Sequence, residues 1–338
     1  MKKVWLIKLM HYEYWPMWAF YLPLLPVILF YGILKRHLFF YTNANPGIDQ
    51  YGGFFFDSKN NIDKNIPVEY RPISVLTNPF HTVNEIDEFI QKTPFTFPVI
   101  LKPDSGERGR GVVKIITEIE LKKVLEQITI PHLIQEYIAY NLEYGVFVSY
   151  LPNEDKYKVI SLTEKKFFTV IGNAFNTIEQ LIKKSERGCV FFEQIMERTF
   201  YDINYIPRLN EICILHTIGN HCNGTEFINR NQWISEELDI SMNKVMSNIK
   251  GIYYGRFDIK VESYKNLEKL EAIKIIEFNG ITAEPTHIYD NTYGYFKSLL
   301  SFITTWKYLY RISNYNKLKG VKPAEHVEMI RKFRSRYF

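Results

Sequence analysis

A chain of 338 residues with 46% hydrophobic and 23% charged residues has the composition of a globular protein, long enough for two or three compact units. A net charge of +5 without a basic block argues against nucleic-acid binding and is compatible with weak attraction to anionic lipid. Three cysteines (Cys189, Cys213 and Cys222) give no disulfide framework and favour a reducing, cytoplasmic compartment. The aromatic fraction of 16% is high and suits interfaces, membrane boundaries or apolar substrate pockets.

The first feature along the chain is an uncharged run over residues 14–34. Its 21 residues would span roughly the bilayer core, about 30 Å, as an unbroken helix. Pro16, Pro23 and Pro26 argue against an unbroken helix, because a proline inside a helix costs ~3 kcal/mol. Seven of the 21 residues are Trp, Tyr or Phe, which prefer the membrane–water boundary. No small-x-small site follows the run, so a secretory signal is not expected.

Three interpretations of this run remain. The aromatic and proline content favours a monotopic or re-entrant membrane contact, which would place the protein at the inner face of the membrane. Alternatively, the run forms short helices buried against the body of the protein or in a homodimer contact. The third interpretation is a single transmembrane span. Basic residues flank both ends of the run, so the loop-charge rule gives no orientation.

The rest of the chain alternates irregularly between apolar runs typical of strands and amphipathic helices. Residues 41–65 are rich in Asn, Gly and Asp and are predicted to form loops. Helices are predicted over 81–93, 117–128, 176–185 and 235–249, and the tail over 293–318 is a helix pair or one long helix. Strands are predicted over 67–75, 97–103, 111–116, 132–138, 143–151, 158–170, 208–218, 224–229, 253–263 and 272–280.

This mixture predicts an α+β fold rather than a doubly wound sheet. We expect an N-terminal hydrophobic segment and loop over 1–65, a smaller subdomain over 66–138, a larger subdomain over 139–290 and a helical tail over 291–338.

Two predicted strands, 97–103 and 111–116, flank a glycine-rich loop. The loop contains Ser105, Gly106, Glu107, Arg108, Gly109, Arg110 and Gly111. Three glycines within six residues let backbone amides approach a polyphosphate, and Lys102 at the end of the first strand would face the same phosphates. The pattern is not a P-loop, because no Gly-Lys-Ser/Thr opens a helix. A flexible hairpin with three turn glycines is the alternative.

The strand over 132–138 carries a second signal. Gln135, Glu136, Tyr137 and Ile138 lie near its end, and Glu143 follows seven residues after Glu136. An edge strand of this kind can offer main-chain donors and acceptors to an adenine ring, and a carboxylate farther along can accept from both ribose hydroxyls. Because Glu at a strand end is common, this signal is weak alone.

The strongest signal lies on the last two predicted strands. Asp258, Glu277 and Asn279 place two carboxylates and one amide on strands joined by a polar turn. Side chains two residues apart share a face of a strand, so Glu277 points to the same side as Asn279, and Arg256 to the same side as Asp258. Such oxygen ligands suit Mg²⁺, and Arg256 could neutralise a growing negative charge. An exposed, ion-paired hairpin is the alternative.

In this order, the motifs resemble the ATP-grasp superfamily over roughly residues 70–290. The most similar members by motif are the D-alanine–D-alanine ligases and the cyanophycin and glutathione synthetases. The resemblance implies an ATP-grasp fold, in which two α+β subdomains clasp ATP. It also implies an enzyme that uses ATP and Mg²⁺ to phosphorylate a carboxylate substrate, joins it to an amine or another nucleophile, and releases ADP and phosphate.

The resemblance also implies roles for individual residues. Lys102 would contact phosphates, and the loop residues Ser105, Gly106, Arg108, Gly109 and Gly111 would close over ATP. Glu136, Tyr137 and Ile138 would frame the adenine, and Glu143 would hold the ribose. Asp258, Glu277 and Asn279 would hold the metal ions. Arg256 would stabilise the intermediates, and either Lys165 or Lys166 would be a further phosphate contact.

The chain also departs from these relatives. The cyanophycin synthetase type has Gly-Asp-Gly where this chain has Gly172, Asn173 and Ala174, and the usual α/β domain ahead of the core is replaced by the hydrophobic run. The acceptor pocket is therefore expected to differ. The aromatic N-terminus favours a substrate that is lipid-like or located at the membrane, and an aromatic pocket for a soluble apolar acid would leave the same pattern in the sequence. The alternatives are a membrane-associated nucleotide-binding scaffold without activity and an ATP-grasp kinase.

Two further groups of residues have more than one interpretation. Cys213, His216, His221 and Cys222 fit no standard zinc spacing, and strand residues of the core are the simpler account. Glu284 and His287 follow the metal strand and either border the acceptor site or end the strand.

Overall fold

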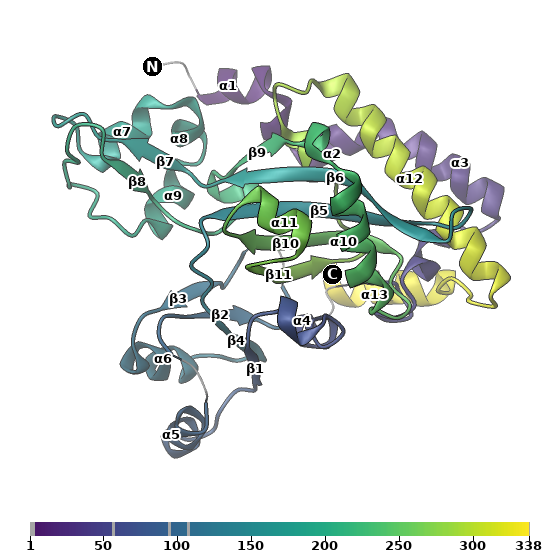
Figure 1. The fold of residues 1–338 in the computed structure, drawn as a ribbon, viewed down its shortest axis with the longest axis horizontal. Helices are drawn as coiled ribbons and strands as arrows, with labels where there is room; N and C mark the ends of the chain where they lie inside the picture. The colour runs from purple at the N-terminus through teal and green to yellow at the C-terminus, as the bar shows by residue number, and fades with distance from the viewer. Residues whose placement is uncertain (1–3, 56–57, 94–95, 107–108, 338) are drawn as a thin grey trace.

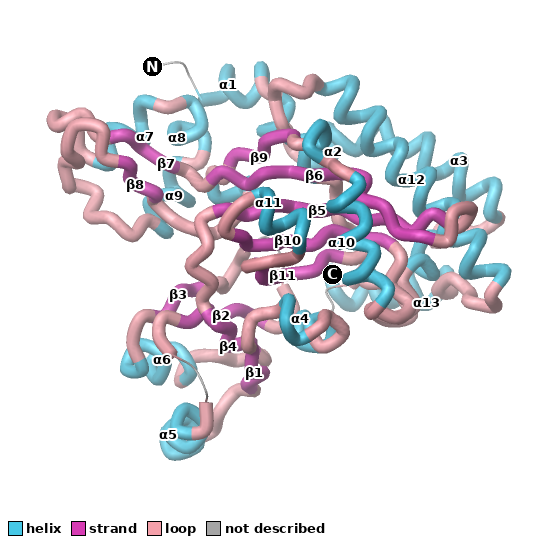
Figure 2. The backbone as a smooth tube through the Cα atoms, in the orientation of Figure 1, coloured by secondary structure: helices cyan, strands magenta, loops and turns pink. Residues whose placement is uncertain are grey.

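The protein is described here by a computed structural model that covers residues 4–55, 58–93, 96–106 and 109–337. Two antiparallel sheets, a small satellite unit and a pair of helical terminal segments make up the fold (Figures 1 and 2). This mixture confirms the α+β class predicted from the sequence.

The smaller sheet has the strand order β1-β4-β2-β3. Its strands are β1 (Ser74–Thr77), β2 (Val99–Pro103), β3 (Val113–Ile115) and β4 (His132–Glu136). Helices α5 (Val83–Gln91) and α6 (Glu118–Leu125) pack on it, and Thr82 and Thr117 cap them by accepting hydrogen bonds from backbone N–H groups. Their apolar faces form one core with Leu101 and Ile134.

The larger sheet has the strand order β11-β10-β5-β6-β9. Its strands are β5 (Leu142–Leu151), β6 (Lys156–Lys166), β9 (Glu226–Asn229), β10 (Tyr254–Val261) and β11 (Ile273–Asn279). One face carries apolar side chains such as Val146, Phe257 and Ile275, which pack with α10 (Glu236–Ser247) and α11 (Tyr264–Lys269) in the largest core. The short helix α4 (Lys59–Asp63) contributes Ile62 to that core. The other face is therefore the one available for a polar site.

A satellite unit follows β6. It contains the two-stranded sheet β7 (Thr169–Ile171) and β8 (Ile212–Ile214), with helices α7 (Ile178–Lys184), α8 (Glu186–Val190) and α9 (Phe192–Arg198). Only three residues of the strand predicted over 208–218 pair in a sheet, because the segment before Ile212 turns to bond Gly172.

The N-terminal segment forms a series of short helices, and those after the first lie along the C-terminal helix α12 (Tyr295–Leu318), as Figure 1 shows. These are α1 (Val4–Met10), α2 (Met17–Tyr21) and α3 (Leu25–Lys35), with a 3₁₀ turn over 22–24 between α2 and α3. Pro16 and Pro26 stand at helix N-terminal positions, where proline costs no hydrogen bond. The stretch Met17–Lys35 is thus helical and apolar enough to cross a membrane by length and composition, although three prolines lie at or beside its turns.

The tail over residues 293–318 is one long helix of 24 residues, α12, and a last helix, α13 (His326–Tyr337), follows. Tyr31 lies 4.9 Å from Tyr310 between ring centroids, and Phe20 and Tyr21 both contact Phe302. The hydrophobic N-terminal segment is therefore held against α12 along much of its length.

Candidate active site

The polar face of the larger sheet carries the ionisable residues that the sequence pointed to. Arg256, Asp258 and Lys260 alternate along β10 and share this face. The antiparallel register places Asp258 opposite Glu277 and Arg256 opposite Asn279 on β11. All five line one cleft of about 1040 Å³ between the two sheets. The proposed metal ligands are thus brought together by strand pairing.

Asp258 is almost fully buried at 4% exposure and lies between two cations. Arg256 Nε donates to one carboxylate oxygen at 2.9 Å, and Lys165 Nζ lies 3.1 Å from the same oxygen. Burial alone would raise the pKa of Asp258, but the charges of Arg256 and Lys165 outweigh burial and lower the pKa. The carboxylate therefore stays ionised at neutral pH.

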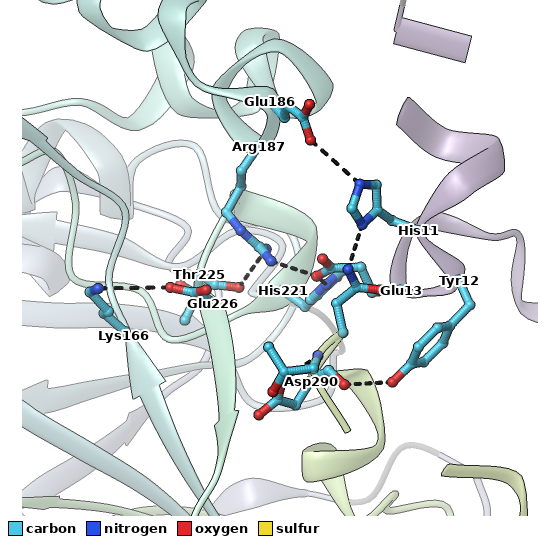
Figure 3. A network of polar contacts seen from close by, with 12 residues as sticks. His11, Tyr12, Glu13, Lys166, Glu186, Arg187, His221, Thr225, Glu226 and Asp290 are labelled. Atoms are coloured by element: carbon cyan, nitrogen blue, oxygen red, sulfur yellow. Dashed lines mark hydrogen bonds and ion pairs between the residues drawn. The ribbon is translucent and has the colours of Figure 1, made fainter. Parts of the chain in front are cut away.

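Lys165 and Lys166, which the sequence left unresolved, point to opposite faces of β6. Lys165 is buried, and its ammonium donates to Glu143 Oε1 at 2.7 Å as well as contacting Asp258. Lys166 is exposed and lies 3.9 Å from Glu226, as Figure 3 shows. A Cβ at Gly219 would lie 2.2 Å from Glu143 Oε1, so a side chain at this position would displace that carboxylate. Lys165 is therefore the lysine of the cleft.

Lys102 reaches the same cleft from the smaller sheet. Its Nζ donates to Gln135 Oε1 at 3.2 Å and to the Ile276 carbonyl at 3.0 Å, and both acceptors are uncharged. Burial lowers the pKa of Lys102, against the opposing charges of Asp63 and Glu277. Within the described residues, the Nε2 atom of Gln135 is buried without an acceptor. A buried ammonium and an unsatisfied donor facing one space favour an anionic ligand.

The glycine-rich loop borders this space. Gly106 and Gly109 line the cleft, Ser105 is exposed, and Arg108 lies outside the described residues. Gly109 and Gly111 have φ values of 67° and 71°, a conformation that favours glycine. Backbone geometry at this loop therefore accounts for two of the three glycines that the sequence emphasised.

The connection between the sheets carries the proposed adenine contacts. Glu136, Tyr137 and Ile138 all line the cleft. The Glu136 carboxylate accepts from the Ile73 backbone N–H at 3.1 Å and so helps hold β1 beside β4. Lys114 lies 4.0 Å from the Tyr137 ring centroid. The segment is thus anchored to the smaller sheet while it opens onto the cleft.

Several residues of the cleft were not predicted from the sequence. Lys59 donates to the Gly106 carbonyl at 2.7 Å and lies 3.7 Å from Glu277, so it joins the glycine-rich loop to β11. Lys260 is buried below the rings of Tyr137 and Phe167. Its alternation with Arg256 and Asp258 was a signal that could have revealed it. Lys59 stands in a loop-like segment and has no such signal.

The N-terminal segment supplies one more charged group to the cleft. Glu13 is buried and pairs with Arg187 and with His221 Nε2 at 3.0 Å, a convergence that Figure 3 shows. Burial alone would raise the pKa of Glu13, but the His221 hydrogen bond and the Arg187 charge lower it. His216 bonds the Asn223 carbonyl, so the histidines suspected of binding zinc engage separate partners.

The residue set fits a magnesium ion and a polyphosphate. Asp258, Glu277 and Asn279 offer oxygen ligands on adjacent strands, the donor type that Mg²⁺ prefers beside phosphate oxygens. Asn279 Nδ2 donates to Asp258 Oδ2 at 3.3 Å, which fixes the amide beside the carboxylate. Lys102, Lys165 and Arg256 supply positive charge to the same cleft.

Comparison with known proteins gives matches to ATP-grasp sequences. A family model described as a RimK-like ATP-grasp domain matches residues 72–149. Cyanophycin synthetase of Trichormus variabilis is 23% identical over 229 residues, which cover 61% of this chain and 24% of that protein. Both matches support the ATP-grasp superfamily. It spans about a quarter of the length of the cyanophycin synthetase that it matches.

Solved structures of ATP-grasp ligases are similar to this chain at low identity. D-alanine–D-alanine ligase from Bacillus anthracis is 16% identical, with a TM-score of 0.40, over 76% of this chain and 68% of that chain. The VanG D-Ala:D-Ser ligase from Enterococcus faecalis is 15% identical, with a TM-score of 0.40, over 75% of this chain and 61% of that chain.

Proposed function

We propose that this ATP-grasp protein is an ATP-dependent ligase that activates a carboxylate as an acyl-phosphate and joins it to an amine. The observation that carries the proposal is the convergence of Lys102, Lys165 and Arg256 with Asp258 and Glu277 in one cleft, where Lys102, Lys165 and Asp258 are buried. A scaffold without activity has no need to hold so many desolvated charges together, because each buried ion costs free energy unless it is paired.

In the proposed first step, a carboxylate oxygen attacks the γ-phosphorus of ATP and ADP leaves. Bound Mg²⁺, held by Asp258, Glu277 and Asn279, would neutralise charge on the phosphates. Lys102 and Lys165 would contact phosphate oxygens, and Arg256 would face the group being transferred. In the second step, the amine nitrogen attacks the acyl carbon, inorganic phosphate leaves, and the ammonium proton passes to a base.

Release of ADP tests this function. The purified protein is incubated with Mg-ATP and either a lipid extract or a soluble-metabolite extract of the host. We expect ADP release that depends on one extract, and Glu277→Gln should reduce it by at least about a hundredfold while the melting temperature stays close to that of the wild type. Phosphorylated acid as the end product would identify a kinase. No release with either extract, together with intact ATP binding, would favour the scaffold.

We also propose that the N-terminal segment contacts the membrane surface. Along Met17–Lys35, one face packs on α12 through Phe20 and Leu24, and the opposite face is exposed. The exposed stripe has side chains between 47% and 72% exposed: Trp18, Leu22, Leu25, Leu29 and Ile33. A helix that is apolar on both faces needs an apolar partner on each face. We therefore propose that the outer face contacts lipid.

Positive charge supports a bilayer as the partner. Lys35 and Arg36 end α3, and burial together with the nearby charge of Lys317 lowers the pKa of Lys35 to about 8. A basic group beside an apolar, Trp-containing helix face complements anionic headgroups. Because the inner face packs on α12, a contact along the membrane plane fits better than a span. The segment would then place the protein at the inner face of the membrane.

A further inference from the structure

Beyond the metal strand, the cleft continues into an aromatic branch. The branch is lined by Trp15, Tyr21, Tyr41, Phe54, Trp306 and Leu309. These side chains come from the N-terminal segment, the loop after it, and α12. The whole cleft measures about 1040 Å³, which is at the upper end of ligand pockets that span roughly 300–1,000 Å³. It has room for a second substrate beside a nucleotide.

The aromatic branch begins within one loop of the reacting groups. The loop after Asn279 leads through Ile281 and Ala283, which are buried in one apolar cluster with Tyr41 and Leu309. Its next residue, Glu284, accepts a hydrogen bond through its carbonyl from Arg256 Nη1 at 3.1 Å. This hydrogen bond ties the Arg256 guanidinium to the loop that borders the aromatic branch.

The aromatic side chains are held in place by one another. The Tyr41 ring lies 5.4 Å from Trp306 and 5.7 Å from Phe54 between centroids, and each pair is edge-on or tilted. The Trp306 and Phe54 rings are partly exposed, because the cleft removes packing partners from one side. When an apolar ligand covers apolar surface that faces a cavity, the free energy of the complex falls.

The charges at the junction specify the sign of the reacting group. Glu143 and Asp258 pair with Lys165, Asp258 also pairs with Arg256, and Lys102 Nζ donates to two uncharged acceptors. These three cations line the cleft that the aromatic branch continues. They attract a carboxylate and repel an ammonium. A carboxylate beside them would have its apolar part directed along Trp306 and Tyr41.

We infer that the aromatic branch binds the tail of the acid that the ligase activates, and that this acid is an amphiphile with an aliphatic or aromatic chain. The inference rests on the proposed function and narrows its substrate class. It also gives the N-terminal segment a second role, because Trp15 and Tyr21 wall the branch while the opposite face of the same segment is exposed. A bilayer on that outer face would be a source of such acids.

Chain-length dependence tests the inference. Binding of dodecanoate and of butanoate to the full chain is measured by calorimetry in the presence of Mg-ADP, below the micellar concentration. Each fully buried methylene adds about fourfold to affinity, so dodecanoate should bind at least about a hundredfold more tightly than butanoate. Equal affinities for the two acids would overturn the inference.

Two variants assign the binding to the branch. Thr282 is exposed and lines the cleft, so Thr282→Trp fills the space without removing a core side chain. It should weaken dodecanoate binding at least about tenfold and leave butanoate and Mg-ADP unchanged. Trp306→Ala should weaken dodecanoate in the same way. Dodecanoate binding that ignores both variants but is lost in Leu29→Glu/Ile33→Glu would place the ligand on the outer helix face and refute the branch.

The same experiment separates this inference from the ligase function. If Mg-ADP does not bind while dodecanoate binding depends on Thr282, the apolar site stands and the proposed function fails. If Mg-ADP binds and short acids alone stimulate ADP release, the ligase stands and the substrate class is wrong.

Discussion

At the charged end of the cleft, strands of one sheet hold ionised side chains, whereas at the other end helices and loops supply aromatic rings. Arg256, Asp258 and Glu277 stand on neighbouring strands, where the backbone ladder fixes their spacing. Tyr41, Trp306 and Trp15 come from segments far apart in the chain. The first arrangement is rigid and suits phosphoryl transfer, which depends on positioning and charge. The second depends on packing between segments that are distant in the chain.

The contrast predicts that a charge within the aromatic end has a structural role rather than a chemical one. Glu13 is that charge, and it joins the N-terminal segment to Arg187 and His221. Glu13→Ala removes the carboxylate partner of the partly buried Arg187, which should lower the free energy of unfolding by about 1–3 kcal/mol. Urea denaturation followed by circular dichroism measures the change.

An exposed pair serves as the control for Glu13. Glu179 and Lys183 form an i,i+4 pair on the surface of α7, so Glu179→Ala should cost below about 0.5 kcal/mol. If Glu13→Ala cost no more than Glu179→Ala, the buried cluster would not hold the N-terminal segment. A loss of ADP release in Glu13→Ala without loss of stability would instead assign Glu13 to the chemistry and remove the contrast between the two ends.

The two ends also differ in how far the sequence predicts them. Alternation along the strands and the Gly-Arg-x-Asp and Glu-x-Asn spacing locate Asp258, Glu277 and Asn279, because residues two apart share a face of a strand. Lys165 and Lys166 are adjacent, so one of them had to point into the cleft, and only the register of β6 with β5 and β9 decides which. The same register places Lys165 beside Glu143 and Asp258.

The aromatic end has no local signal of this kind. Tyr41 and Trp306 are more than 250 residues apart, and they meet because η3 (Phe40–Ala44) packs on α12. The prolines of the uncharged run correctly indicate interrupted helices. Pro16 and Pro26 stand at α-helix starts and Pro23 lies in the 3₁₀ turn between α2 and α3, so the helical stretch Met17–Lys35 changes helix type without an intervening loop. Composition therefore reveals that an aromatic surface exists, and tertiary contacts decide which rings face the cleft.

The exposed stripe on Met17–Lys35 should bind anionic vesicles, whereas an exposed apolar pair elsewhere on the protein should not. In flotation with vesicles of phosphatidylcholine and phosphatidylglycerol, Leu29→Glu/Ile33→Glu should reduce the bound fraction at least about tenfold, because it puts charge on the exposed stripe. Ile116→Glu/Ile119→Glu changes equally exposed isoleucines at the smaller subdomain and should leave binding unchanged.

Two outcomes would contradict the membrane contact. Wild-type protein that stays out of the floating fraction with anionic vesicles would remove it. A wild-type dimer that Leu29→Glu/Ile33→Glu converts to a monomer, without vesicle binding, would assign the stripe to a second copy of the chain. Binding to vesicles of phosphatidylcholine alone should be weaker than to the anionic vesicles, because Lys35 and Arg36 then have no opposite charge to meet.

The smallest expected effect lies at the border between the two ends. Glu284 lines the cleft, its carboxylate accepts from the Tyr289 hydroxyl at 2.5 Å, and burial raises its pKa to about 7. Because this pKa is above that of the unfolded chain, the folded protein holds a proton that the unfolded chain has lost between about pH 5 and pH 7. The contribution of Glu284 to stability is therefore fully present at low pH and is lost as the pH rises through about 7.

A comparison of the wild type with Glu284→Gln isolates this group from others that titrate in the same window, such as Asp63, whose pKa burial raises to about 6. The stability difference between wild type and variant, from urea denaturation at several pH values, should shift by about 1 kcal/mol between pH 5 and pH 8. The full shift in pKa would give more, but the carboxylate faces a cleft that admits water, which screens its charge. A pH-independent difference would show that Glu284 stays ionised like the carboxylates on the strands. The charged end of the cleft would then include Glu284, and the border between the charged end and the aromatic branch would lie beyond Tyr289.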